Sequence, residues 1–364
     1  MKTKKKNHRL CIVLLILTAT SVPLQACAKE LLPTTTQIPP ASDTLTLYNW
    51  IDYMPQSVMD AFTEEYGIKV NYIYYESQEE AVDNIRAGKE YDLVVLPPEL
   101  IPALIEDESL ARIDYRNVLN FKNTCPSFRD LAFDPGNQYS IPFHWGTTGL
   151  LYRTDLVQKP VLEWADLWDP EFAGRVGIWP ISRAVIPITL KSLGYPANSE
   201  DPAQLQEALE RMLTLRQNSF LVSNDNSSIV PMLAEGKAVI GFGWAYDALT
   251  VEDLPIEYVI PKEGSILWSD HFVIPATSRN KRGAELFLDF ILRPEISGKI
   301  INESYYPMAN DAASPFVAPD ILSNPIVYPP QEVIKHSELT LALSPEGLKL
   351  YDEIWQQFLN AGSP

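Results

Sequence analysis

The sequence predicts an α/β protein built on a doubly wound sheet, and two observations carry this prediction. After residue 43, short runs rich in β-branched and aromatic residues alternate with longer segments whose apolar residues recur at helical spacing. The first such series has the order β-α-β-α-β, which is typical of a parallel sheet with helices on both faces. A chain of 364 residues, 46% of them hydrophobic, is also long enough to bury one large core or two smaller ones.

The first series can be followed element by element. LTLYNW at 45–50 is a predicted strand, and residues 57–66 have apolar side chains at helical spacing. IKVNYIYY at 68–75 is the second strand, and the capping box at 77–80 opens the next helix. YDLVVL at 91–96 has almost no polar content, as expected of a central parallel strand. Ligands of such sheets bind at the carboxyl ends of the strands, which are the places of Asp52 and Glu99 here.

A second α/β region begins near Gly149. No internal repeat and no low-complexity tract follows residue 43. Its predicted strands are 175–179, 237–244 and 272–276, and its predicted helices include 208–216, 284–295 and 347–359.

The N-terminus is typical of a secretory signal, because a basic segment precedes a moderately long apolar run and small residues. We expect residues 1–26 to be removed. Cys27 follows Leu-Gln-Ala, a pattern resembling the bacterial lipobox, so we expect lipidation of Cys27; ordinary cleavage with a soluble product is the alternative. The Thr/Pro-rich residues 27–42 are typical of a disordered tether to a membrane.

Charge and cysteine content exclude several classes. Without residues 1–26 the chain has 24 basic and 47 acidic residues, which argues against binding to nucleic acid or to anionic membrane surfaces. A cationic ligand is compatible with this charge, as is plain solubility. With Cys11 in the signal and Cys27 at the lipobox, Cys125 remains alone, so we expect no intrachain disulfide.

The usual motifs of catalysis and metal binding are missing from the sequence. The four histidines form no H-x-x-x-H pair, and neither a G-x-S-x-G elbow nor a Walker loop occurs. GFGWAY at 241–246 lacks the third glycine of a dinucleotide fingerprint, so we interpret it as strand and loop. We expect no enzyme activity, no cofactor and no metal.

Tryptophan and aspartate stand together three times. The pairs are Trp50 with Asp52, Trp244 with Asp247, and Trp268 with Asp270. Any single pair is most simply explained by a core tryptophan and an aspartate that caps a helix or forms a turn. Three pairs near strand ends suggest one purpose, because aromatic faces attract cations and pack methylene chains, while carboxylates bind ammonium groups.

These residues belong to stretches that resemble the bacterial periplasmic spermidine/putrescine-binding proteins of ABC transporters. The resemblance covers nearly all of residues 45–360. The stretches that carry it are LYNWIDYMP, GIKVNYIYYES, YDLVV, FDPGNQYSIPFHWGTTG, WADLWDPEFAGRV, IPKEGSILWSD, AELFLDFILRP and YYPMAN.

The resemblance implies a two-lobed periplasmic binding protein fold. Each lobe is a doubly wound mixed sheet with flanking helices, and a hinge lets the lobes close over a ligand. The lobes are expected at 43–148 plus 270–314 and at 149–269 plus 315–364.

The resemblance also implies which residues bind the ligand. Asp247 and Asp270 would hold an ammonium group, and Asp52 would take another nitrogen. The aromatic side chains would pack the alkyl chain; they are Trp50, Tyr53, Trp244, Trp268 and Tyr306.

Two segments depart from the family pattern. Ile181 and Ala184 stand where family members usually have acids, close to Arg183. Glu99 stands near the place of a tyrosine and either supplies the missing charge or is a solvated acid at a helix start.

The expected function is therefore capture of a polyamine, putrescine- or spermidine-like, by the monomeric binding protein of an ABC importer. It would act in the periplasm or on the outer face of the cell membrane, with a permease in the inner membrane as its partner. The open alternatives are a different amine or an amino acid admitted by the loss of acids at Ile181 and Ala184, ferric iron bound by Tyr305 and Tyr306, and a sensor role.

Overall fold

The computed structural model describes residues 42–222, 228–251 and 253–362. The predicted signal sequence at 1–26, the lipidation site Cys27 and the tether at 27–42, except its last residue, lie outside this part of the chain. Among the helices of the described ranges, none has the length and apolar character needed to cross a membrane.

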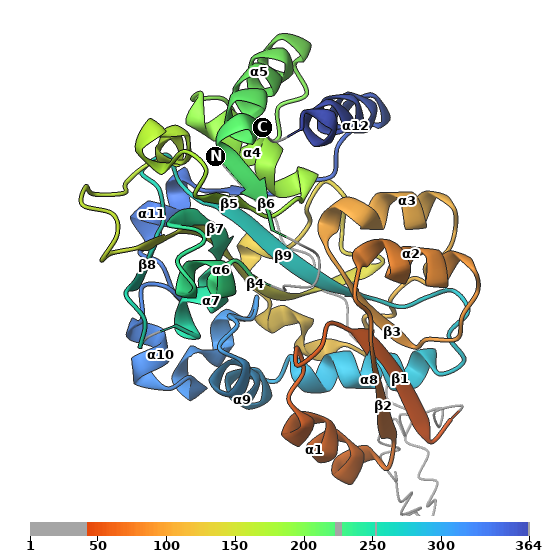
Figure 1. Ribbon diagram of the computed structural model, residues 1–364. Coiled ribbons are helices and arrows are strands. Elements are labelled where there is room, and N and C mark those ends of the chain that lie inside the picture. The colour runs from red at the N-terminus through yellow and green to blue at the C-terminus, as the bar shows by residue number, and fades with distance from the viewer. Residues whose placement is uncertain (1–41, 223–227, 252, 363–364) are drawn as a thin grey trace, which may run out of the picture. The chain divides into compact units, whose positions relative to one another are not determined.

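A mixed sheet of ten strands forms the centre of the described part of the chain (Figure 1). Its main path has the order β2-β1-β3-β9-β4-β7-β5-β6, with β8 beside β4 and β10 beside β9. The strands are β1 (Thr44–Asn49), β2 (Lys69–Tyr74), β3 (Leu93–Leu96), β4 (Ser140–Arg153), β5 (Val176–Ile178), β6 (Ser219–Leu221), β7 (Ile240–Trp244), β8 (Ile256–Val259), β9 (Ile266–Val273) and β10 (Glu338–Leu339).

Helices alternate with these strands along the chain, as the sequence predicts. The α-helices are α1 (Gln56–Tyr66), α2 (Gln78–Arg86), α3 (Ile101–Glu106), α4 (Ser182–Ser192), α5 (Pro202–Asn218), α6 (Val230–Ala234), α7 (Ala245–Leu249), α8 (Lys281–Ile291), α9 (Pro294–Ser304), α10 (Pro319–Ser323), α11 (Gln331–His336) and α12 (Pro345–Asn360). The 3-10 helices are η1 (Pro98–Leu100), η2 (Leu119–Asn123), η3 (Pro126–Phe128), η4 (Trp164–Trp168), η5 (Pro170–Phe172) and η6 (Asp311–Phe316).

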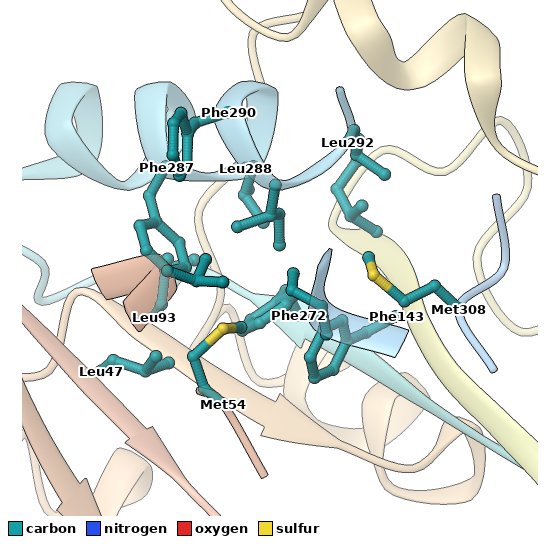
Figure 2. Packing of buried hydrophobic residues seen from close by; sticks show 14 of the residues in the cluster. Leu47, Met54, Leu93, Phe143, Phe272, Phe287, Leu288, Phe290, Leu292 and Met308 are labelled. Carbon is teal, nitrogen blue, oxygen red and sulfur yellow. The ribbon is translucent and has the colours of Figure 1, made fainter. Parts of the chain in front are cut away.

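The first half of the sheet is doubly wound. Strand β1 pairs in parallel with both β2 and β3, and its alternate residues face opposite layers of helices. Leu45 and Leu47 pack with Phe62 of α1 and Phe287 of α8 in one core, part of which Figure 2 shows. Tyr48 faces the other way, into a core formed with α2 and α3. The β-α-β-α-β prediction is confirmed.

The second half repeats the plan with β7-β5-β6 as its parallel strands. Helices α4, α5 and α12 cover one face, where Ile178 and Met212 are fully buried. Helices α6 and α7 cover the other face, where Leu233 and Ala248 pack beneath Leu151 of β4. Each half therefore has its own core on both faces, which is the architecture of a two-lobed binding protein.

Two strands carry the chain from one half to the other. Within β4, Phe143 packs in the core of the first half and Leu150 in that of the second. Strand β9 does the same with Phe272 and Ile266. These strands pair antiparallel to each other, with an irregularity between Pro142 and Trp145 of β4.

Two element predictions are wrong in their bounds. The strand predicted at 272–276 is part of β9, which ends at Val273 and begins at Ile266, where polar side chains interrupt the apolar run. The helix predicted at 284–295 is two helices, because Pro294 cannot continue α8 and instead starts α9.

Candidate functional site

Asp270 is the buried centre of the candidate site. Strand β9 lies between β3 and β4 in the sheet, so the Asp270 side chain is only 7% exposed. Burial, together with a smaller contribution from the charge of Glu99, raises the pKa of its carboxyl to about 7. The Tyr53 hydroxyl donates a 2.7 Å hydrogen bond to Asp270 Oδ2, which partly offsets the shift. An ammonium group beside Asp270 would supply the compensation that this buried carboxylate lacks.

Four aromatic rings gather around this carboxylate, and we call them the aromatic cluster: Tyr53, Tyr246, Trp268 and Tyr306. Tyr306 is central. Its ring lies 4.9 Å from that of Tyr53, 5.9 Å from that of Trp268 and stacks on Tyr246 at 4.7 Å. The cluster joins residues of β9 and α7 to those that follow β1 and α9, and rings in this arrangement can pack methylene groups and attract cations.

A strained turn brings Tyr53 into the cluster. Asp52 has a left-handed backbone with φ of 55°, which aspartate tolerates better than most residues. The turn exposes Asp52 to solvent and buries Tyr53, which is 6% exposed. Burial next to Asp270 raises the pKa of the Tyr53 hydroxyl, so it stays a hydrogen-bond donor. Tyr53 is thus in the predicted site, whereas Asp52 lies outside its buried part.

Gly146 makes room for Trp268. A Cβ atom at position 146 would lie 2.4 Å from Cζ2 of the indole ring. The Trp268 indole therefore packs directly against the main chain of β4 at Gly146. Among the described residues, the buried Trp268 Nε1 has no hydrogen-bond partner, so a donor remains available beside Asp270.

Asp247 is a second buried carboxylate. It is 7% exposed, and its Oδ2 accepts a 2.9 Å hydrogen bond from the backbone N–H of Trp244. Burial raises the pKa of Asp247 to about 6. Gly243 leaves space for it, because a Cβ there would lie 2.6 Å from Asp247 Oδ2. Burial raises the pKa of the Tyr306 hydroxyl, and the charge of Asp247 contributes to this rise, so this carboxylate borders the aromatic cluster.

The two remaining predicted tryptophans face aromatic partners. Trp50 packs against Tyr75, with ring centroids 4.5 Å apart, and Trp244 meets Trp179 at 6.0 Å. The buried Tyr75 donates a hydrogen bond to the carbonyl oxygen of Val95. Burial and the charge of Asp270 raise the pKa of its hydroxyl. Both tryptophans are half-buried, as side chains that line a binding surface are.

His144 fixes the segments that carry two cluster residues. Its ring nitrogens lie 3.3 Å from the carbonyl oxygens of Tyr53 and Pro307. Burial lowers the pKa of His144 to about 3, so the imidazole is neutral. The neutral ring has one N–H and can donate to one of these carbonyl oxygens, and it also packs against the Tyr53 and Tyr306 rings.

The structure brings most predicted residues together. Asp270, Tyr53, Trp268 and Tyr306 form one group through ring contacts and a hydrogen bond, while Asp247 and Glu99 act on it through their charges. Sequence reasoning missed Tyr75, Tyr246, Trp179 and His144. Two of these had a signal: Tyr246 lies inside the WAYD motif, and Trp179 directly follows the parallel strand β5.

Within the described ranges, no three His, Cys, Asp or Glu side chains are grouped so as to hold a metal ion. Tyr305, half of the pair considered for iron, is 45% exposed with a left-handed backbone, whereas Tyr306 turns into the aromatic cluster.

A hollow of about 380 Å³ elsewhere on the surface is bordered by Lys191 and Glu338. These side chains already form a 2.9 Å ion pair with each other, which gives them a structural role.

Comparison with known proteins adds the family context. The family described as bacterial extracellular solute-binding protein matches residues 57–327. The spermidine/putrescine-binding periplasmic protein of Escherichia coli (strain K12) is 35% identical over 326 residues, which are 88% of this chain and 92% of that protein. A putrescine/agmatine-binding protein of Pseudomonas aeruginosa is 31% identical over 316 residues, or 81% of this chain and 86% of that protein.

A solved structure agrees with the sequence comparisons. The crystal structure of a spermidine/putrescine ABC transporter substrate-binding protein from Streptococcus pneumoniae has a TM-score of 0.79 to this chain at 30% identity. The match covers 88% of this chain and 99% of that one.

Proposed function

Since the chain belongs to the family of bacterial extracellular solute-binding proteins, we propose that it captures a polyamine outside the cytoplasm and delivers it to an ABC importer. The observation that carries the proposal is the buried Asp270 carboxylate, with its raised pKa, beside the aromatic cluster. A site of this composition suits an alkyl chain that ends in ammonium groups. The names of the relatives point to the same class of ligand.

We assign roles to the site residues accordingly. Asp270 holds one ammonium group, with Tyr53 orienting its carboxylate, and Asp247 holds another. Trp50, Trp244 and the aromatic cluster pack the methylene chain, and Tyr306 links the two carboxylates. Glu99 contributes charge near Asp270. Asp52 takes a nitrogen at the exposed edge of the site.

The lobes are proposed at 43–148 plus 270–314 and at 149–269 plus 315–364. We adjust the second boundary so that α10 goes with the first lobe, because Ile321 packs in the first core. Closure of the lobes about β4 and β9 would trap the ligand, and the protein would act by binding and not by catalysis.

The protein's partners follow from this role. We propose that it works as a monomer, held to the outer face of the cell membrane through lipidated Cys27, and that it hands its ligand to a permease. The relatives named periplasmic support an extracytoplasmic location.

Calorimetry with putrescine and spermidine tests the proposal. We expect Asp270→Asn to weaken binding of the better ligand at least tenfold, about 1.4 kcal/mol, because the variant removes the charge that pairs with the buried ammonium. Glu235→Gln is the control: this acid is exposed and pairs with Lys237 at the surface, so its loss should leave the affinity unchanged. Equal affinities for wild type and Asp270→Asn would refute the site assignment.

Thermal shift separates the ligand classes. Polyamines should raise the melting temperature and amino acids should not, because ligands stabilise only the state that binds them. Stabilisation by amino acids alone would contradict the proposed function.

A further inference from the structure

Glu99 lies at the turn that leads out of β3 toward Asp270. Strand β3 pairs antiparallel with β9, and Leu96 lies opposite His271. The next residues of the chain therefore pass the position of Asp270, and η1, which contains Glu99, packs against β9. This register explains why the charge of Glu99 raises the pKa of Asp270.

The Glu99 carboxylate has an unused acceptor. Its Oε2 atom is buried and, within the part of the chain that the structure describes, accepts no hydrogen bond. Burial raises the pKa of Glu99, and the positive charge of Arg183 is the main influence that lowers it again. The two residues come from different halves of the fold, but α4, which contains Arg183, packs against β9 as η1 does, so both charges lie along that strand.

Residues of the second half hold the Arg183 side chain in place. Its Nη2 donates to the carbonyl oxygen of Leu341 and, at 3.5 Å, to Asn198 Oδ1, while its guanidinium carbon lies 5.2 Å from the Tyr351 ring centroid. Its Nε and Nη1 atoms are buried and meet no acceptor among the described side chains. The guanidinium is anchored in α4 with two donors left over, close to the segment where Ile181 and Ala184 replace acids.

We propose that Arg183, opposed by Glu99, sets the charge of the preferred ligand and makes this site select a dicationic amine over a tricationic one. The inference rests on the proposed function. The charge of Arg183 offsets that of the half-buried Glu99. The buried Asp247 and Asp270 then leave two negative charges for the ligand. A third ammonium group would meet Arg183 with no buried carboxylate left to pair with, and desolvating it there is unfavourable. Asp52 changes this balance little because water screens its exposed charge.

Isothermal calorimetry with putrescine as the dication and spermidine as the trication, at one pH and one ionic strength, tests this. Wild type should bind putrescine at least tenfold more tightly than spermidine. Arg183→Gln should reduce that ratio at least fivefold by removing the repelling charge. Arg183→Lys keeps the charge and should keep the wild-type ratio, which separates charge from packing. Glu99→Gln should weaken both ligands and increase the ratio, because Arg183 is then unopposed.

Several outcomes would overturn the inference. One is a wild type that prefers spermidine, and another is an Arg183→Gln variant that folds, as judged by its melting temperature, and keeps the ratio within twofold. Binding of 4-aminobutyrate that is lost in Arg183→Gln would assign the guanidinium to a ligand carboxylate instead. Absence of binding of either amine to wild type would defeat the proposed function itself, whereas tight binding with an unaltered ratio would defeat only the role of Arg183.

Discussion

Amine binding should weaken as the pH falls below 7, because protons compete with the ligand for Asp270. In the empty site burial raises the pKa of this carboxyl to about 7, while the bound ammonium requires the ionised form. Binding below pH 7 therefore has to release a proton. The amine itself, with a pKa near 10, stays charged throughout the range, so the loss of affinity comes from the protein.

The magnitude follows from linkage. Each pH unit below the pKa costs up to tenfold in affinity, about 1.4 kcal/mol. Because Asp270 is already half protonated at pH 7, it alone should weaken binding roughly 50-fold between pH 7 and pH 5. Asp247, with its pKa raised to about 6, should add a further factor of about ten over the same range.

Calorimetry from pH 5 to pH 8 in two buffers of different ionisation enthalpy measures both the affinity and the number of protons released. Wild type should release close to two protons per amine at pH 5 and almost none at pH 8. In Asp270→Asn the step near pH 7 should vanish, leaving the weaker step of Asp247. An affinity that is flat from pH 8 to pH 5, or a variant with the wild-type slope, would refute this reasoning.

Three further results are expected. Without ligand, Asp270→Asn should be more stable than wild type at pH 8. The pKa of Asp270 is near 7 in the folded state and near 4 in the unfolded state. The stability that the protonated carboxyl gives wild type is therefore full below pH 4 and is lost as the pH rises through 7, by up to about 4 kcal/mol. Equal denaturation midpoints of the two proteins at pH 8 would contradict this. Gly146→Ala should cost about 1–3 kcal/mol in denaturant unfolding and weaken ligand binding because its Cβ collides with Trp268, whereas Gly362→Ala, in open space, should cost nothing. Tyr246→Ala should weaken amine binding severalfold by removing the ring stacked on Tyr306, and Tyr246→Phe should not; equal losses in the two variants would show that the hydroxyl, and not the ring, matters.

Local patterns were enough to predict the first three strands and their helices. The alternation of Leu45, Leu47 and Tyr48 between two cores is a property of the strand itself, and the capping residue Ser77 indeed accepts from the backbone N–H of Glu80. The fold class follows from such local features because strands and helices with one apolar face can bury that face in only a few layered arrangements.

The site was predictable as a set of residues but not as a geometry. The pair Trp244 and Asp247 is local, since a backbone hydrogen bond joins them. The bond from Tyr53 to Asp270 spans 217 residues of sequence, and no periodicity encodes it. The bounds of β9 failed for the same reason: its polar residues are strand residues only because β3 and β4 pair with them.

The interleaving of the two halves has a consequence for synthesis. Strand β3 is completed at Leu96, but its neighbour β9 begins at Ile266, and the first core also needs Phe287 from α8. The ribosome must therefore add well over a hundred residues before β1, β2 and β3 can be covered. The early strands therefore lack these later neighbours through most of translation, and apolar surface exposed in this way makes an incomplete chain prone to aggregate.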